Sequence, residues 1–170
     1  LGNFSAVDTI NVSHAPRHVR AADFDNDGFT DFATANNEDD TVAIYRCDGD
    51  GTFTFVETIA VGDGAETVTP ANLNGDLFVD LIITNDTHDD TDDTEDITFL
   101  QNDTDGTFTN VGSLDLPGDR ARFSAAYDFD NNGLDDFVTT IFDTDEFIIV
   151  RNDGGGSYTK FSPVSSGLDR

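Results

Sequence analysis

The sequence has one cysteine, no tryptophan, no methionine and a single lysine among its 170 residues. The lone Cys47 excludes a disulfide within the chain, so packing, hydrogen bonds or metal ions must hold the fold. No stretch approaches the roughly 20 apolar residues of a membrane-spanning helix, and we therefore expect no membrane insertion. No basic-then-apolar signal peptide opens the chain and position 1 is Leu, from which we expect a processed product or a piece of a longer protein.

Positive charge is also scarce. Lys and Arg number 8 against 35 Asp and Glu, which gives a net charge of −27, and only five of the acids are Glu. Such a surface repels phosphate backbones and anionic membrane faces, so neither nucleic acid nor a membrane is an expected partner. Two uses of the excess Asp remain open: metal ligation, and a solvating coat suited to high salt.

This charge predicts that salt stabilises the fold. Three bound Ca²⁺ ions would add six positive charges and leave −27 + 6 = −21. The residual repulsion reaches about 10 Å at 0.1 M salt but only about 3 Å at 1 M. The melting temperature at saturating calcium should therefore rise with the concentration of NaCl or KCl. A melting temperature that stays constant or falls would contradict the interpretation of the acidic surface as an adaptation to salt.

An acidic segment occurs three times. The run Asp23-Phe-Asp-Asn-Asp-Gly-Phe-Thr-Asp31-Phe32 returns as Asp128-Phe-Asp-Asn-Asn-Gly-Leu-Asp-Asp136-Phe137. A more divergent copy lies between them, Asn72-Leu-Asn-Gly-Asp-Leu-Phe-Val-Asp80-Leu81. A Gly-rich turn followed by an aromatic residue recurs in step, ending at Phe53, Phe108 and Tyr158. Two landmarks in register indicate a structural repeat of about 50 residues.

Short runs rich in Val, Ile, Phe and Thr separate these landmarks, and each is too short for a helix. Four short strands per repeat are typical of a propeller blade. The expected fold is all-β, with three four-stranded antiparallel blades forming a partial or oligomer-completed propeller. We place blade 1 at 17–61, blade 2 at 65–115 with an acidic insertion at 86–96, and blade 3 at 120–164. Residues 1–12 match the segment after the Gly-rich turn, which predicts one orphan outer strand of a preceding blade.

The acidic loops have the composition of calcium sites. Oxygen-bearing side chains stand at positions 1, 3, 5 and 9, and position 7 offers a backbone carbonyl. Ca²⁺ takes six to eight oxygen ligands in flexible geometry, whereas Mg²⁺ requires a strict octahedron. Gly28 and Gly133 permit a sharp turn at position 6. The candidate ligands are Asp23, Asp25, Asp27, Phe29 (backbone O) and Asp31; Asn72, Asn74, Asp76, Phe78 (backbone O) and Asp80; and Asp128, Asp130, Asn132, Leu134 (backbone O) and Asp136.

The three loops differ in expected strength. Loop 3 has Asn132 in place of Asp27 and so carries one charge less, while loop 2 has Asn at two ligand positions and Leu77 in place of the turn glycine. We expect Ca²⁺ in loops 1 and 3, with loop 2 as a third and weaker candidate. An EF-hand is excluded because position 12 lacks Glu and the flanks are strand-like. Ordinary hairpin turns also favour Asp, Asn and Gly, and this metal-free alternative is weakened by the repetition in register.

These residues resemble the FG-GAP/VCBS repeat, whose core pattern is Asp-x-Asp-x-Asp-Gly-x-x-Asp-hydrophobic. The resemblance covers nearly the whole chain and implies blades like those of integrin α-chains, with calcium between the first two strands. Related repeats occur in fungal lectins, polysaccharide lyases and large microbial surface proteins, so the resemblance implies fold and metal more strongly than function.

The leading functional hypothesis is a non-catalytic extracellular or cell-surface module for adhesion, assembly or ligand binding. Its expected partners are a protein or glycan at a cell surface. The alternatives are a glycan-binding lectin-like propeller and a propeller domain of a polysaccharide lyase or other carbohydrate-active enzyme. No catalytic constellation is evident, and we name no catalytic residue. Three blades cannot close a ring, so we expect further blades of a longer parent chain or a homo-oligomer, and favour the former.

Overall fold

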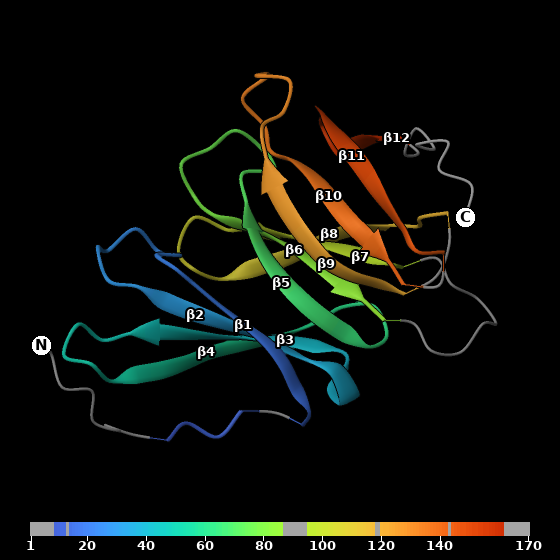
Figure 1. Ribbon diagram of the computed structural model, residues 1–170. Helices are drawn as coiled ribbons and strands as arrows, with labels where there is room; N and C mark the ends of the chain where they lie inside the picture. Colours follow the sequence, from blue (N-terminus) through green and yellow to red (C-terminus); the bar gives the residue numbers. More distant parts are fainter. Residues whose placement is uncertain (1–8, 13, 87–94, 118–119, 143, 162–170) are drawn as a thin grey trace, which may run out of the picture.

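The computed structural model describes residues 9–12, 14–86, 95–117, 120–142 and 144–161. Three four-stranded antiparallel sheets form the fold, and in each of them consecutive strands are neighbours (Figure 1). This confirms the all-β, blade-type fold expected from the sequence. Sheet A contains β1 (Pro16–Ala22), β2 (Asp31–Asn36), β3 (Thr41–Cys47) and β4 (Phe53–Ala60); sheet B contains β5 (Ala65–Ala71), β6 (Asp80–Asn85), β7 (Ile97–Asn102) and β8 (Phe108–Leu114); sheet C contains β9 (Ala121–Tyr127), β10 (Asp136–Ile141), β11 (Glu146–Gly154) and β12 (Ser157–Phe161).

Local sequence accounts for the hairpins within each sheet. The acidic loops join the first strand to the second, and the Gly-rich turns join the third to the fourth. The turns of sheets A and B close in the same way, because the Asp48 amide donates to the Thr52 carbonyl and the Asp103 amide to the Thr107 carbonyl, both at 2.9 Å. A three-residue 3₁₀ turn, Asn37–Asp39, joins β2 to β3. Each blade is thus a meander with its acidic loop at one end.

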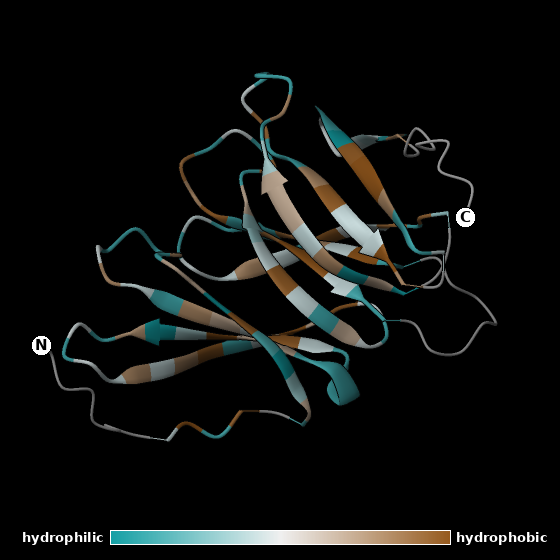
Figure 2. Ribbon diagram, in the orientation of Figure 1, coloured by the Kyte–Doolittle hydropathy of each residue, from teal (hydrophilic) through white to brown (hydrophobic). Residues whose placement is uncertain are grey.

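The sheets pack face to face, with sheet B between sheets A and C. Their first strands, β1, β5 and β9, lie next to one another (Figure 1). Apolar residues line the facing surfaces, and the brown, hydrophobic segments in Figure 2 lie largely on the strands. The A–B core contains Phe24, Ala33, Ala35, Val42, Ile44, Ile59, Ala65, Val68, Leu81, Ile83, Leu100 and Phe108; the B–C core contains Ala71, Leu73, Ile82, Ile97, Phe99, Leu116, Ala121, Phe137, Ile141, Ile148 and Val150.

The chain ends and the acidic insertion are described only in part. Residues 1–8 of the expected orphan strand and residues 87–94 of the insertion lie outside the described residues. Residues 9–12 are described and are not in a strand. The two ends of the insertion are anchored, since the Asn85 amide donates to the Asp96 carbonyl at 2.8 Å and Asp96 is buried.

Candidate functional site: three acidic loops

The three acidic segments occupy equivalent places, each between the first and second strand of its sheet. Loop 1 comprises 23–31, loop 2 comprises 72–80 and loop 3 comprises 128–136, where the ninth residue of each is also the first residue of the second strand. Among the described residues, two groups of three carboxylates have oxygens within 4.8 Å of one another, Asp23–Asp25–Asp27 in loop 1 and Asp128–Asp130–Asp136 in loop 3. The structure therefore brings together three of the five expected ligands in each of the two loops that the sequence ranked highest.

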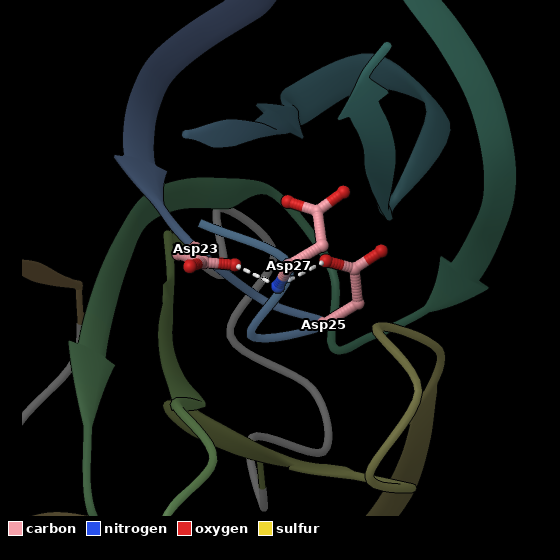
Figure 3. Close-up of side chains that lie close together, drawn as sticks. All are labelled: Asp23, Asp25 and Asp27. Carbon is pink, nitrogen blue, oxygen red and sulfur yellow. Dashed lines mark hydrogen bonds between the residues drawn. The ribbon is translucent and has the colours of Figure 1, made fainter. Parts of the chain in front are cut away.

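Loop 1 wraps its own backbone around its carboxylates. The Asp27 amide donates to Oδ1 of both Asp23 and Asp25 at 3.2 Å (Figure 3). The Gly28 amide donates to the second oxygen of Asp23 at 2.9 Å. This turn needs φ of +92° at Gly28, a region that side chains strongly disfavour. Position 6 is therefore glycine because the loop must fold back on itself to gather the carboxylates.

Loop 3 repeats this arrangement. The Asn132 amide donates to Asp128 and Asp130 at 3.1 Å, and the Gly133 amide donates to Asp128 at 2.9 Å. Gly133 has φ of +91°. The side-chain nitrogen of Asn132 donates to the Asn152 carbonyl at 2.9 Å. Loop 3 thus has the geometry of loop 1 with one carboxylate fewer at position 5.

Loop 2 is built differently. Its glycine stands at position 4, where Gly75 has φ of +82°, and Leu77 at position 6 is 90% exposed. The Asn74 side-chain nitrogen donates to Asp76 Oδ2 at 2.7 Å, so that carboxylate oxygen already accepts a hydrogen bond within the loop. Asn72 is turned toward loop 3 and donates to the Gly133 carbonyl at 3.2 Å. Because the side chains of Asn72 and Asn74 are already hydrogen-bonded to the protein, loop 2 is the weakest of the three candidate calcium sites.

The aspartate at position 9 has a structural task in all three loops. Asp31, Asp80 and Asp136 are 2%, 0% and 1% exposed. One oxygen accepts the amide of the position-2 residue at 2.9 Å. The other accepts an amide near the end of the third strand at 2.8–2.9 Å. Each of these carboxylates therefore fixes its acidic loop to the third strand, and only Asp136 also lies within a three-carboxylate group.

The electrostatics of loop 1 favour a cation. Burial raises the pKa of the Asp25 carboxyl, and the neighbouring Asp27, Asp31 and Asp23 charges raise it further, against a lowering by the Asp27 amide. A bound divalent cation would relieve this repulsion. Carboxylate and carbonyl oxygens are hard ligands that suit Ca²⁺ rather than thiolate- or imidazole-seeking metals. The residues present thus fit the calcium that the sequence predicts.

The arginines before the loops form a network that sequence reasoning did not locate. Arg122 contacts Glu66 at 3.3 Å and Asp86 at 3.0 Å, and Arg120 contacts Asp86 at 2.8 Å. Arg17 of sheet A approaches Glu66 at 3.9 Å. These three arginines precede loops 1 and 3 in the sequence, and in the structure they link the sheets near the start of β1, β5 and β9. Partners up to 56 residues apart leave no local signal.

Substitution of ligands should reproduce the ranking of the loops. Asp25→Ala removes a charged candidate ligand from loop 1, whereas Asn74→Ala removes a neutral one already bonded to Asp76. In calcium, we expect Asp25→Ala to lower the free energy of unfolding by about 2 kcal/mol or more, and Asn74→Ala by under about 1 kcal/mol. Denaturant unfolding measures both, and equal losses would contradict the ranking.

Comparison with known protein families is consistent with this geometry. The model of the FG-GAP-like repeat family matches residues 23–83. That range begins at the first aspartate of loop 1, continues through β2, β3 and β4 of sheet A, and ends within β6 after loop 2. No curated protein sequence matches the chain. Within the described residues no helix is long and apolar enough to cross a membrane. The repeat match and the three sheets together indicate a repeat module of a propeller-like domain.

Proposed function

We propose that this chain is a calcium-binding, non-catalytic propeller module of the integrin-α/VCBS type that acts outside the cell in adhesion, assembly or ligand binding. The observation that carries the proposal is the equivalence of loops 1 and 3. Each gathers three carboxylates within 4.8 Å on a backbone turned by a glycine at position 6. Calcium would stabilise the ends of two blades, and the surrounding loops would present the recognition surface to a protein or glycan.

The choice of Ca²⁺ over Mg²⁺ follows from the ligands. The carboxylates alternate along a short loop together with backbone carbonyls, which suits the irregular coordination of Ca²⁺. Mg²⁺ loses its water slowly and requires a regular octahedron. Calorimetric titration of the calcium-stripped chain should give two binding events for CaCl₂ and much weaker heat for MgCl₂. A stoichiometry of zero, or equal affinity for both ions, would contradict the proposal.

Two variants assign the binding events to the loops. Asp23→Ala should remove the event of loop 1 and Asp128→Ala that of loop 3, because each residue supplies both of its oxygens to the wrapped turn. Asp63→Ala is a matched control, since this aspartate lies between sheets A and B, outside the loops. The two calcium events should persist in the control. Loss of both events in either single variant would mean that the sites are not independent.

A glycan-binding role is the second candidate, and a groove favours it. A hollow of about 520 Å³ runs between sheets B and C and is lined by Asn74, Gln101 and the stacked pair Phe99–Tyr158. The rings of that pair lie 4.3 Å apart. Burial, and to a lesser extent Asp80, raises the pKa of Tyr158 to about 12, so its hydroxyl remains protonated. The side-chain amides of Asn74 and Gln101 and the hydroxyl of Tyr158 suit a sugar, and the buried Phe99 holds the Tyr158 ring in place from behind.

A glycan array tests this candidate directly. Binding should fall at least about tenfold in Gln101→Ala, because a pocket that pairs a ligand hydroxyl loses that affinity when the partner is removed. Turnover of polysaccharides by the intact chain would instead favour the lyase alternative. Absence of signal on the array would contradict the glycan-binding candidate.

A further inference from the structure

The contacts between sheets follow one rule. Each sheet has two faces. One face carries the residue at position 2 of the acidic loop and alternate residues of the third strand, and we call it the forward face. In sheets A and B the forward face packs on the next sheet. The opposite face carries the aromatic residue after the Gly-rich turn, and we call it the backward face; in sheets B and C it packs on the preceding sheet. Forward faces are represented by Phe24, Val42 and Ile44 in sheet A, Leu73, Ile97 and Phe99 in sheet B, and Phe129, Phe147 and Ile149 in sheet C; backward faces by Phe32, Phe53 and Phe55 in sheet A, Leu81, Leu100 and Phe108 in sheet B, and Phe137, Val150 and Tyr158 in sheet C.

The forward face of sheet C is apolar but uncovered by any sheet among the described residues. Its position-2 residue, Phe129, is 52% exposed, whereas Phe24 and Leu73 at the same position are 1% and 8% exposed. The third-strand residues Phe147 and Ile149 are 48% and 38% exposed, and their equivalents in sheets A and B are almost fully buried. Sheet C therefore has large apolar side chains at the positions that are buried in sheets A and B, although no described sheet packs against them.

The backward face of sheet A shows the reciprocal feature. Phe108 meets Phe24 edge to face at 5.4 Å and is 5% exposed, while Tyr158 stacks on Phe99. Phe53 occupies the same position in sheet A, yet it is 37% exposed. Its neighbour Phe55 is 54% exposed.

A hydrogen bond accompanies each of the two packed interfaces. The side-chain nitrogen of Asn102 donates to the Phe24 carbonyl at 2.8 Å, and that of Asn152 donates to the Leu73 carbonyl at 2.9 Å. Both asparagines occupy the third-strand position paired with the turn aromatic. In sheet A this position is Cys47. The uncovered backward face thus has the aromatic surface of the packed ones without the amide donor.

The sequence alone favours further blades of a longer chain, but the two exposed faces carry, at matching positions, the residues that pack in the A–B and B–C interfaces. We therefore propose that the forward face of sheet C docks on the backward face of sheet A in a second copy of this chain. One chain cannot make this contact itself, because sheet B lies between the two faces. Two copies satisfy both faces twice and close a ring of six sheets, within the usual range of propellers. A heterologous contact that closes in this way gives a dimer rather than a filament.

Two features of the chain limit the strength of this association. The net charge of −27 per copy opposes it, so salt and calcium should promote it. The segment 10–12 lines a groove on sheet A together with Tyr45, Phe53 and Phe55, so it must pack against the incoming sheet or be displaced by it. Light scattering after size-exclusion chromatography in 1 M NaCl and calcium should give twice the 18.4 kDa chain mass. A monomer at every accessible concentration would overturn the proposal.

Substitutions identify the surface. Ile149→Asp on sheet C and Phe55→Asp on sheet A should each raise the dimer dissociation constant about tenfold or more, since a charge replaces an apolar contact in both interfaces of the ring. Val111→Asp makes the same kind of change at a 53% exposed aliphatic residue of β8, outside both faces, and should leave the dimer intact. A dimer unaffected by Ile149→Asp and Phe55→Asp would place association elsewhere and overturn the proposal.

Mixing the two variants tests which face meets which. A mixed dimer has one interface free of substitutions, because the intact sheet C of one variant meets the intact sheet A of the other. Where each substitution is severe enough to prevent its interface from forming, each variant alone is monomeric, whereas the mixture keeps one intact interface and should form a heterodimer. A mixture that stays as monomeric as the separate variants would overturn the pairing of unlike faces. Cys47→Asn should tighten the wild-type dimer by supplying the missing amide donor. Because the variants leave loops 1 and 3 unchanged, calcium titration of the monomers reports separately on the metal sites.

Discussion

Removal of calcium is expected to lower the melting temperature of this protein by about 10–20 °C at low ionic strength. A ligand present at 100 times its dissociation constant stabilises the folded state by roughly 2.7 kcal/mol per site, and two sites contribute roughly 5 kcal/mol. For a chain of this size, each 1 kcal/mol corresponds to about 2–4 °C. Chelation also leaves the carboxylates of loops 1 and 3 within 4.8 Å of one another without a counter-charge.

The measurement is a thermal melt followed by circular dichroism, in excess calcium and in EDTA. The double variant Asp25→Ala/Asp130→Ala is the control, since it removes one carboxylate from each loop and should melt at nearly the same temperature in both buffers. Raising NaCl to 1 M in EDTA should recover part of the loss, because screening weakens the repulsion that the ion would have neutralised. An identical melting curve with and without EDTA at low ionic strength would show that the metal assignment is wrong.

The second large effect is expected at Asp80, in the loop least suited to calcium. Both of its oxygens accept backbone amides, from Leu73 and Asn102 at 2.9 Å, and the residue is fully buried. Asp80→Ala leaves two buried amides without acceptors, which costs roughly 1–3 kcal/mol each. We expect a loss of about 3 kcal/mol or more in the free energy of unfolding, equal in calcium and in EDTA.

Two further substitutions separate this structural task from metal binding. Asp76→Ala makes the same change in the same loop, but Asp76 accepts only local bonds from Phe78 and Asn74, so its loss should stay below about 1 kcal/mol in EDTA. Asp80→Asn keeps one acceptor oxygen and should be milder than Asp80→Ala. Burial raises the pKa of the Asp80 carboxyl, which means that the site favours the uncharged form and should tolerate the neutral asparagine side chain. Equal losses for Asp76→Ala and Asp80→Ala would contradict the structural task of position 9.

The sequence by itself determined the strands, the hairpins and the composition of the loops, because these depend on local preferences. Glycine at position 6 of loops 1 and 3 anticipates the positive φ that both turns adopt. Alternating Asp at positions 1, 3 and 5 places carboxylates on the inside of a tight turn, which the structure confirms in loop 1. The register of the two landmarks likewise anticipated three four-stranded sheets.

Only the tertiary structure decided which residues act across the repeats. Phe53 and Phe108 have the same local sequence, Gly-Thr-Phe, yet one is 37% and the other 5% exposed, because only Phe108 has a preceding sheet to cover it. The position-9 aspartates look like metal ligands in the sequence, while their bonds to the third strand depend on where that strand lies. Arg122 meets Glu66 because β5 and β9 are neighbours in space. Burial and long-range pairing depend on how the sheets pack together. The repeat pattern in the sequence therefore does not predict which face of each sheet is covered by another sheet.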